Sequence, residues 1–173
     1  MITEEAVERV RGWFAGRLPE EWRTQPPRIS VDREEITVVL TLPDVELGGD
    51  VSEAEAAEAR AGRVKAFREE TRDRRIAIAR EAEHRFDRKV SWGVDLGGHH
   101  ELFTHIAVPV MTRLRQPQRQ VLDTLVEAGV ARSRADALAW CVRLVGQHTE
   151  EWLSELRQAM SHVADVRAKG PAT

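Results

Sequence analysis

The chain has 173 residues, of which 42% are hydrophobic and 32% are charged, and its formal net charge at neutral pH is −3. This balance is typical of a folded globular protein and excludes both a disordered chain and a polycation, while the single cysteine, Cys141, excludes a disulfide framework and a cysteine zinc site. No apolar run approaches the about 20 residues that span a bilayer, and the N-terminus lacks a signal-peptide pattern, so we expect a cytoplasmic protein without a membrane partner.

The first predicted element is a helix at residues 3–16, capped by Thr3, with apolar residues at helical spacing. After a proline-rich break, "ISVDREEITVVLTLP" predicts a β-hairpin with "DREE" as its turn, and one strand face carries Ile36, Val38, Leu40 and Leu42. Residues 51–89 predict a long helix that Gly62 divides. That helix carries 11 basic and 9 acidic residues, and such mixed signs favour a solvated surface over a nucleic-acid face.

The next segment, "VSWGVDLGGHHELFTHIAVPV", predicts a second hairpin in which "DLGG" forms the turn and the return strand continues to Val110. Three helices follow, at residues 117–128, 133–145 and 149–168, with the last break at Gly146 and Thr149. The expected fold class is therefore α+β, with an N-terminal α-ββ-α-ββ region and a helical C-terminal part. The expected domains are residues 1–103, 104–148 and 149–173.

The sequence contains no motif that indicates catalysis, so we do not expect an enzyme, a cofactor or a metal site. His99, His100 and His105 gather around the second hairpin, but they lack the spacing of a helical metal site, and exposed histidines are the commoner case. Cys141 lies on a predicted helix face beside Trp140 and is interpreted as a buried structural thiol. An enzyme of unrecognised type stays open as a third possibility.

The corner between the two predicted helices after residue 116 carries clear local signals. Pro117 suits the first turn of a helix, Gly129 suits the left-handed position that ends one, and Ser133 with Asp136 resembles a capping box for the next. Residues 105–146 contain six arginines and three acidic residues, which gives a local net charge of +3. These two short helices and the preceding strand are too small to bury their apolar faces alone, so they need the N-terminal region or a second copy.

The segment "TRLRQPQRQVLDTLVEAGVARSRADALAWCVRLV" resembles the ribbon-helix-helix family of bacterial DNA-binding proteins. The resemblance covers about residues 108–145; "LDTLVEAG" is similar to the first family helix and "ARSRADAL" to the turn into the second. In that family two chains pair their strands into a ribbon that enters the major groove, and the second helix anchors a phosphate at its N-terminus.

The resemblance implies that Val110, Thr112 and Leu114 face the core. The DNA-contacting residues that it implies are Met111, Arg113, Arg115, Arg132, Ser133 and Arg134. Arg113 is the expected base reader, because an outward arginine can hydrogen-bond guanine through two donors. Pro109 cannot donate to a strand ladder, and the second hairpin claims the same strand. Whether Met111–Leu114 pairs with its symmetry mate or within its own chain is therefore left open.

Two functions follow as expectations. The first is a homodimeric DNA-binding protein, a transcriptional regulator whose N-terminal region supports the dimer or senses an effector. The alternative is a non-catalytic interaction or scaffold protein, in which the C-terminal helices form a dimer interface without DNA and the 51–89 helix contacts a protein partner. The sequence alone does not separate these two.

Overall fold

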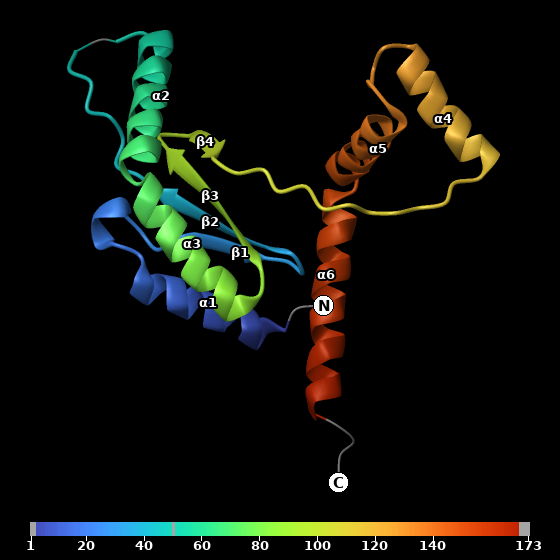
Figure 1. Ribbon diagram of the computed structural model, residues 1–173, viewed down its shortest axis with the longest axis horizontal. Helices are drawn as coiled ribbons and strands as arrows, with labels where there is room; N and C mark the ends of the chain where they lie inside the picture. The colour runs from blue at the N-terminus through green and yellow to red at the C-terminus, as the bar shows by residue number, and fades with distance from the viewer. Residues whose placement is uncertain (1–2, 50, 170–173) are drawn as a thin grey trace. The chain divides into compact units, whose positions relative to one another are not determined.

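The computed structural model describes residues 3–49 and 51–169 of the chain (Figure 1). The chain divides into two compact units, Met1–Pro109 and Val110–Thr173. The predicted α+β class is confirmed, because a four-stranded sheet and six α-helices form within the described residues, and the C-terminal unit is helical. The last residues of the domain predicted at 149–173, residues 170–173, lie outside the described residues.

The N-terminal unit is built on one sheet with the strand order β1-β2-β3-β4. The strands are β1 (Arg28–Val31), β2 (Glu35–Thr41), β3 (Lys89–Leu96) and β4 (His99–Leu102). Both predicted hairpins are present as antiparallel pairs. Their turns also form as predicted, since Asp32 accepts hydrogen bonds from the backbone of Glu34 and Glu35, and Gly97 and Gly98 both adopt positive φ. The two hairpins join in register through a parallel β2–β3 pair, which the sequence did not predict.

Helices cover the sheet face that carries the predicted apolar residues (Figure 1). These helices are α1 (Glu4–Arg17), α2 (Glu53–Glu70) and α3 (Arg72–Phe86), with a short 3-10 turn at Glu20–Trp22. Thr3 caps α1 as predicted by accepting a hydrogen bond from the Ala6 backbone. The core contains Phe14 from α1, Val64 and Phe67 from α2, Ile78 and Ala82 from α3, and the predicted face of β2. Because β2 and β3 are parallel, α2 and α3 form the crossover connection between them.

The long charged helix breaks at Thr71 and not at Gly62, which lies inside α2. Thr71 is buried, and its hydroxyl donates to the Phe67 carbonyl at 2.6 Å while accepting a bond from Arg75 at 3.0 Å. A threonine side chain that bonds back to the preceding turn bends a helix. The prediction at Gly62 was wrong because an exposed helical glycine weakens a helix without interrupting its hydrogen bonds.

The return strand of the second hairpin is shorter than predicted. β4 ends at Leu102, and residues 104–115 have no regular secondary structure, so the prediction of a strand reaching Val110 was wrong. The Phe103 backbone still donates to Trp92, but the Phe103 ring packs against the core and beneath the guanidinium groups of Arg68 and Arg75. The chain therefore leaves the sheet at Phe103, and the segment from Met111 to Leu114 is not paired with its own hairpin.

Replacing Gly93 by alanine should lower the free energy of unfolding of the N-terminal unit by about 1–3 kcal/mol. A Cβ at this position would lie 2.6 Å from Leu102 Cδ2 and 3.0 Å from the Glu101 carbonyl oxygen, so β4 would have to move. Urea unfolding followed by circular dichroism measures the change. Gly62→Ala is the matched control, since nothing lies within 4 Å of its new Cβ and a helical alanine should stabilise α2. Equal destabilisation by both substitutions would contradict the steric explanation.

The C-terminal unit consists of α4 (Gln116–Glu127), α5 (Arg134–His148) and α6 (Glu150–Lys169). The first two helices follow the prediction closely, with Pro117 in the first turn of α4. Of the break predicted at Gly146 and Thr149, the Thr149 position is confirmed, because α5 and α6 part there and the Thr149 backbone and hydroxyl both donate to the Val145 carbonyl. The Gly146 position was wrong, because α5 continues through it. No helix in the described ranges combines the length and apolarity that crossing a membrane requires.

Candidate functional site

The corner between α4 and α5 has the geometry that the sequence predicted. Gly129 adopts a φ of +73°, and its backbone donates to the Val126 carbonyl to close the end of α4. Ser133 begins α5 by accepting a hydrogen bond from the Asp136 backbone at 3.2 Å, and Asp136 accepts one from the Arg132 backbone at 3.0 Å. These bonds satisfy backbone donors that a helix start leaves free, so the corner is a defined structural element.

The core of the C-terminal unit is small. Its buried residues are Leu122, Ala131 and Ala137. Partly buried neighbours complete it, and they are Leu114, Leu125, Val126, Leu138 and Cys141. Leu114 thus faces the core as the resemblance implied, and Cys141 packs at its edge, half-buried rather than fully buried as expected. Two of these three buried residues are alanines, so this core supplies little hydrophobic stabilisation.

Large apolar side chains remain exposed on the same unit. Val110 is 85% exposed and Met111 is 97% exposed. Within each of two helices, exposed apolar residues recur at intervals of three or four, and we call these residues the apolar stripe: Val142 and Val145 of α5, and Trp152, Leu156, Met160 and Val163 of α6. Isolated exposed apolar residues are ordinary, whereas series of exposed apolar residues along a helix are typical of interaction surfaces.

Three of the residues implied to contact DNA lie in the irregular segment before α4. Met111, Arg113 and Arg115 are all exposed. Among the described residues, neither Arg113 nor Arg115 forms a side-chain ion pair. Val110 and Thr112 are exposed as well, so the inward position implied for them is not present in the single chain. This segment therefore offers two arginines that are free to bind an anion.

The other three implied residues lie at the start of α5. Ser133 is the helix cap, and Arg132 is 94% exposed in its side chain with only a 3.6 Å contact to Asp136. Arg134 is held by two hydrogen bonds to Asp123 of α4, at 2.6 and 2.8 Å. These bonds lower the pKa of Asp123 from its ordinary value and raise that of Arg134. Arg134 thus links α4 to α5 in the single chain, and a phosphate at this position would have to share it with Asp123.

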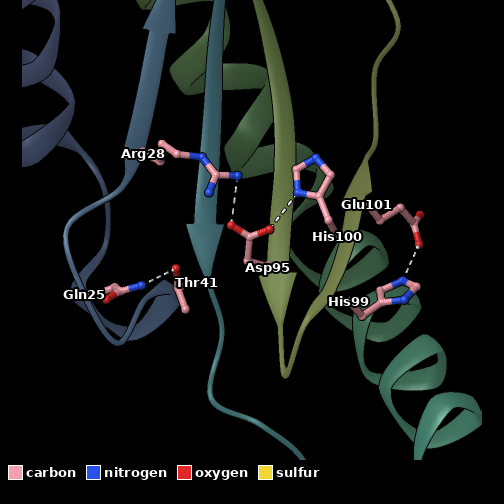
Figure 2. A network of polar contacts seen from close by, with 7 residues as sticks. All are labelled: Gln25, Arg28, Thr41, Asp95, His99, His100 and Glu101. Carbon is pink, nitrogen blue, oxygen red and sulfur yellow. Dashed lines mark hydrogen bonds and ion pairs between the residues drawn. The ribbon is translucent and has the colours of Figure 1, made fainter. Parts of the chain in front are cut away.

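A polar network at one end of the sheet was not predicted (Figure 2). Asp95 of β3 lies 2.6 Å from Nδ1 of His100 on β4, and its other oxygen lies 3.0 Å from Arg28 of β1. Asp95 and His100 are direct cross-strand partners, so the two-glycine turn could have located this pair from the sequence. Among the described residues, His100 forms its side-chain hydrogen bond with Asp95 and none with a hydroxyl or thiol group. Exposed contacts between charged side chains of this kind contribute little to the stability of a fold.

The histidines of the second hairpin do not converge on a metal site. His99 lies 3.6 Å from Glu101 on the same strand, whereas His100 points to Asp95 (Figure 2). In the part of the chain that the structure describes, no group of three or more histidine, cysteine or acidic side chains is arranged to hold a metal ion. His99 and His100 therefore each lie beside a carboxylate of the sheet, and His105 lies in the irregular segment after β4.

Fold and site together define a two-domain α+β protein, in which a small mixed sheet with a helical layer is followed by a helical unit with an exposed apolar surface. The chain belongs to the Rv1265-like family, because the family described as "Rv1265-like protein, N-terminal domain" matches residues 8–102. A second family, "Mb1296 C-terminal domain", matches residues 115–167. Each match lies inside one of the two structural units.

Two similar curated proteins are mycobacterial. The chain is 65% identical over 159 residues to the uncharacterized protein Rv1265 of Mycobacterium tuberculosis strain H37Rv, which covers 92% of this chain and 69% of that protein. It has the same identity and coverage with the uncharacterized protein Mb1296 of Mycobacterium bovis. No solved structure matches the chain.

Proposed function

We propose that the protein is a homodimer that binds DNA through its C-terminal unit and acts as a transcriptional regulator. The observation that carries this proposal is the unpaired segment before α4. It holds exposed Val110 and Met111 next to Arg113 and Arg115, which form no ion pair among the described residues, and it is followed by α4 and the Gly129–Ser133 corner. This is the order of parts in the ribbon-helix-helix proteins that the sequence resembles.

A second copy accounts for the exposed apolar residues. The segment around Met111 is free of its own hairpin, so two such segments can pair as an antiparallel ribbon and place Val110 and Thr112 against the shared core. Such an isologous interface would also cover Val142 and Val145 of α5. Each valine side chain buried in this way contributes about 1.5–3 kcal/mol, which the small core of the single unit does not supply.

The arginines supply the contact with DNA. In the paired ribbon Met111, Arg113 and Arg115 would alternate with the core-facing residues and point outward to the bases. Arg132 and the backbone N–H groups of the first turn of α5, which follows Ser133, would lie near the phosphates, since the start of a helix attracts anions. The excess of arginine over acidic residues in residues 105–146 favours this contact.

The alternative function is association without DNA. The apolar stripe continues from α5 along α6, beyond the part that resembles the DNA-binding family, and Arg134 is already occupied by Asp123. Both observations suit a protein interface in which the arginines only solubilise the surface. Dimer formation without DNA binding at low salt would favour this alternative.

Arg113→Ala should lower the affinity for target DNA by about tenfold, because one arginine that reads a base contributes about 1–3 kcal/mol. Fluorescence anisotropy with duplexes selected from genomic DNA, repeated over a range of salt concentrations, measures the loss. The wild-type affinity should fall steeply with salt.

Arg9→Ala is the matched control. It removes one positive charge from an exposed position on α1, outside the proposed interface, and should leave the affinity unchanged. An equal loss of affinity in both variants would show that the effect comes from the overall charge of the protein and not from Arg113. The absence of salt-sensitive binding by the wild type would refute DNA binding.

A further inference from the structure

A basic cavity lies in the N-terminal unit, between the α2–α3 junction and the strand end after β4. It has a volume of about 510 Å³ and is lined by four basic and two acidic side chains. Its basic residues are Lys65, Arg68, Arg72 and Arg75. Cavities that hold small ligands have volumes of about 300–1,000 Å³, so this one is large enough for a small organic molecule.

Arg75 is the residue that makes this cavity unusual. It is only 7% exposed, yet no carboxylate of the described residues lies within ion-pair distance of it. Its Nε donates to Thr71 Oγ1 at 3.0 Å and its Nη2 to the Arg68 carbonyl at 2.7 Å, both of which are neutral acceptors. Among the described residues its Nη1 has no hydrogen-bond partner, and this atom remains accessible to solvent. A buried cation without an anionic partner is costly.

The positive charges next to Arg75 make an anion bound in the cavity more favourable. Burial, together with the smaller effects of the Arg68 and Arg72 charges, lowers the pKa of Arg75 to about 10. The guanidinium is still protonated at neutral pH. The other two arginines are only loosely compensated, since Arg68 lies 3.8 Å from Glu101 and Arg72 lies 3.7 Å from the exposed Asp73.

The cavity also has an apolar side. Phe103 lies under two guanidinium groups, with the Arg75 and Arg68 Cζ atoms 4.8 and 5.4 Å from the ring centroid. Ile76 is 36% exposed and lines the same cavity. These two residues offer an apolar surface next to the three arginines. A bare inorganic ion bound to the arginines would leave this apolar surface in contact with water.

We propose that this cavity binds a small organic phosphate, whose phosphoryl group contacts Arg68, Arg72 and Arg75 and whose organic part lies against Phe103 and Ile76. Guanidinium groups bind phosphate oxygens through paired donors. A phosphoryl group carries nearly two negative charges at neutral pH, which suits three arginines lining one cavity better than the single charge of a carboxylate does. The proposal concerns the N-terminal unit and is independent of the DNA binding proposed for the C-terminal unit.

Isothermal titration calorimetry of the full chain at constant ionic strength tests the proposal. Phenyl phosphate should bind saturably and more tightly than inorganic phosphate, and benzoate, which has the same ring but one charge, should bind more weakly than phenyl phosphate. Phenyl phosphate without saturable binding at millimolar concentration would overturn the proposal. Affinities for inorganic phosphate or benzoate that match phenyl phosphate would also overturn it.

Substitutions locate the site. Arg72→Ala changes an exposed side chain and should weaken phenyl phosphate binding by about tenfold or more, the loss expected for a hydrogen bond to a charged group. Arg80→Ala on the same helix removes the same charge outside the cavity and should leave the affinity unchanged. An equal loss in the two variants, or displacement of phenyl phosphate by duplex DNA, would show that the cavity is not a small-molecule site.

Discussion

Val145→Glu in α5 is expected to convert the proposed dimer into a monomer, weakening self-association by about a hundredfold or more. In the single chain Val145 is 56% exposed, so a glutamate is tolerated there and the monomer should stay folded. In a dimer that covers this face, each copy would bury an unpaired carboxylate, and a buried charge without a partner costs about 3–5 kcal/mol. Sedimentation velocity over a range of protein concentrations measures the change.

Gln147→Glu is the matched control for this substitution, since it introduces the same charge into the same helix at an exposed position outside the apolar stripe. It should leave the dimer intact. Loss of DNA binding in Val145→Glu but not in Gln147→Glu would show that DNA binding depends on the proposed dimer. A wild-type protein that is monomeric at micromolar concentration would contradict the proposed interface.

Phe14→Ala is expected to lower the free energy of unfolding of the N-terminal unit by about 3–5 kcal/mol, a large fraction of the stability of an ordinary domain. The Phe14 side chain is fully buried, and its ring meets Trp13 and Trp92 edge-on at centroid distances of 4.8 and 6.2 Å. Its removal leaves a cavity between α1 and the sheet. Urea unfolding followed by circular dichroism measures the loss.

Phe14→Leu provides the comparison, because it retains much of the side-chain volume and should cost less than half as much as alanine. Hydrogen exchange should locate the destabilisation of Phe14→Ala in residues of the N-terminal unit, with α4 and α5 unaffected, since the two units have separate cores. Equal loss of protection in both units would contradict that separation.

The parts of the fold that the sequence predicted depend on signals within a few residues. The Thr3 cap, the Asp32 turn, the paired glycines at 97 and 98 and the stop at Gly129 each involve a backbone conformation that neighbouring residues determine. The alternation in β2 likewise identified its buried face correctly. Local chemistry was enough for these elements because their hydrogen bonds close within one turn.

The parts that were missed depend on contacts between distant segments. The parallel pairing of β2 with β3 leaves no local pattern, and the end of β4 follows from where the Phe103 ring packs. The buried Arg75 was also not recognisable, because residues 51–89 contain so many charges that one inward-facing arginine does not stand out. The predicted contacts with DNA remain predictions, since the single chain lacks the partner strand that would orient Met111 and Arg113.

The parallel pair at the centre of the sheet has a consequence for the order of folding. Glu35 pairs with Lys89, so these strands meet only after the whole intervening chain has closed into a loop. Each hairpin can form early because its strands are adjacent, but neither has a complete hydrophobic face until this closure occurs. Pairing between distant segments slows folding. During synthesis the N-terminal unit therefore cannot complete its core before β3 has left the ribosome, and until then the first hairpin presents an unpaired strand edge.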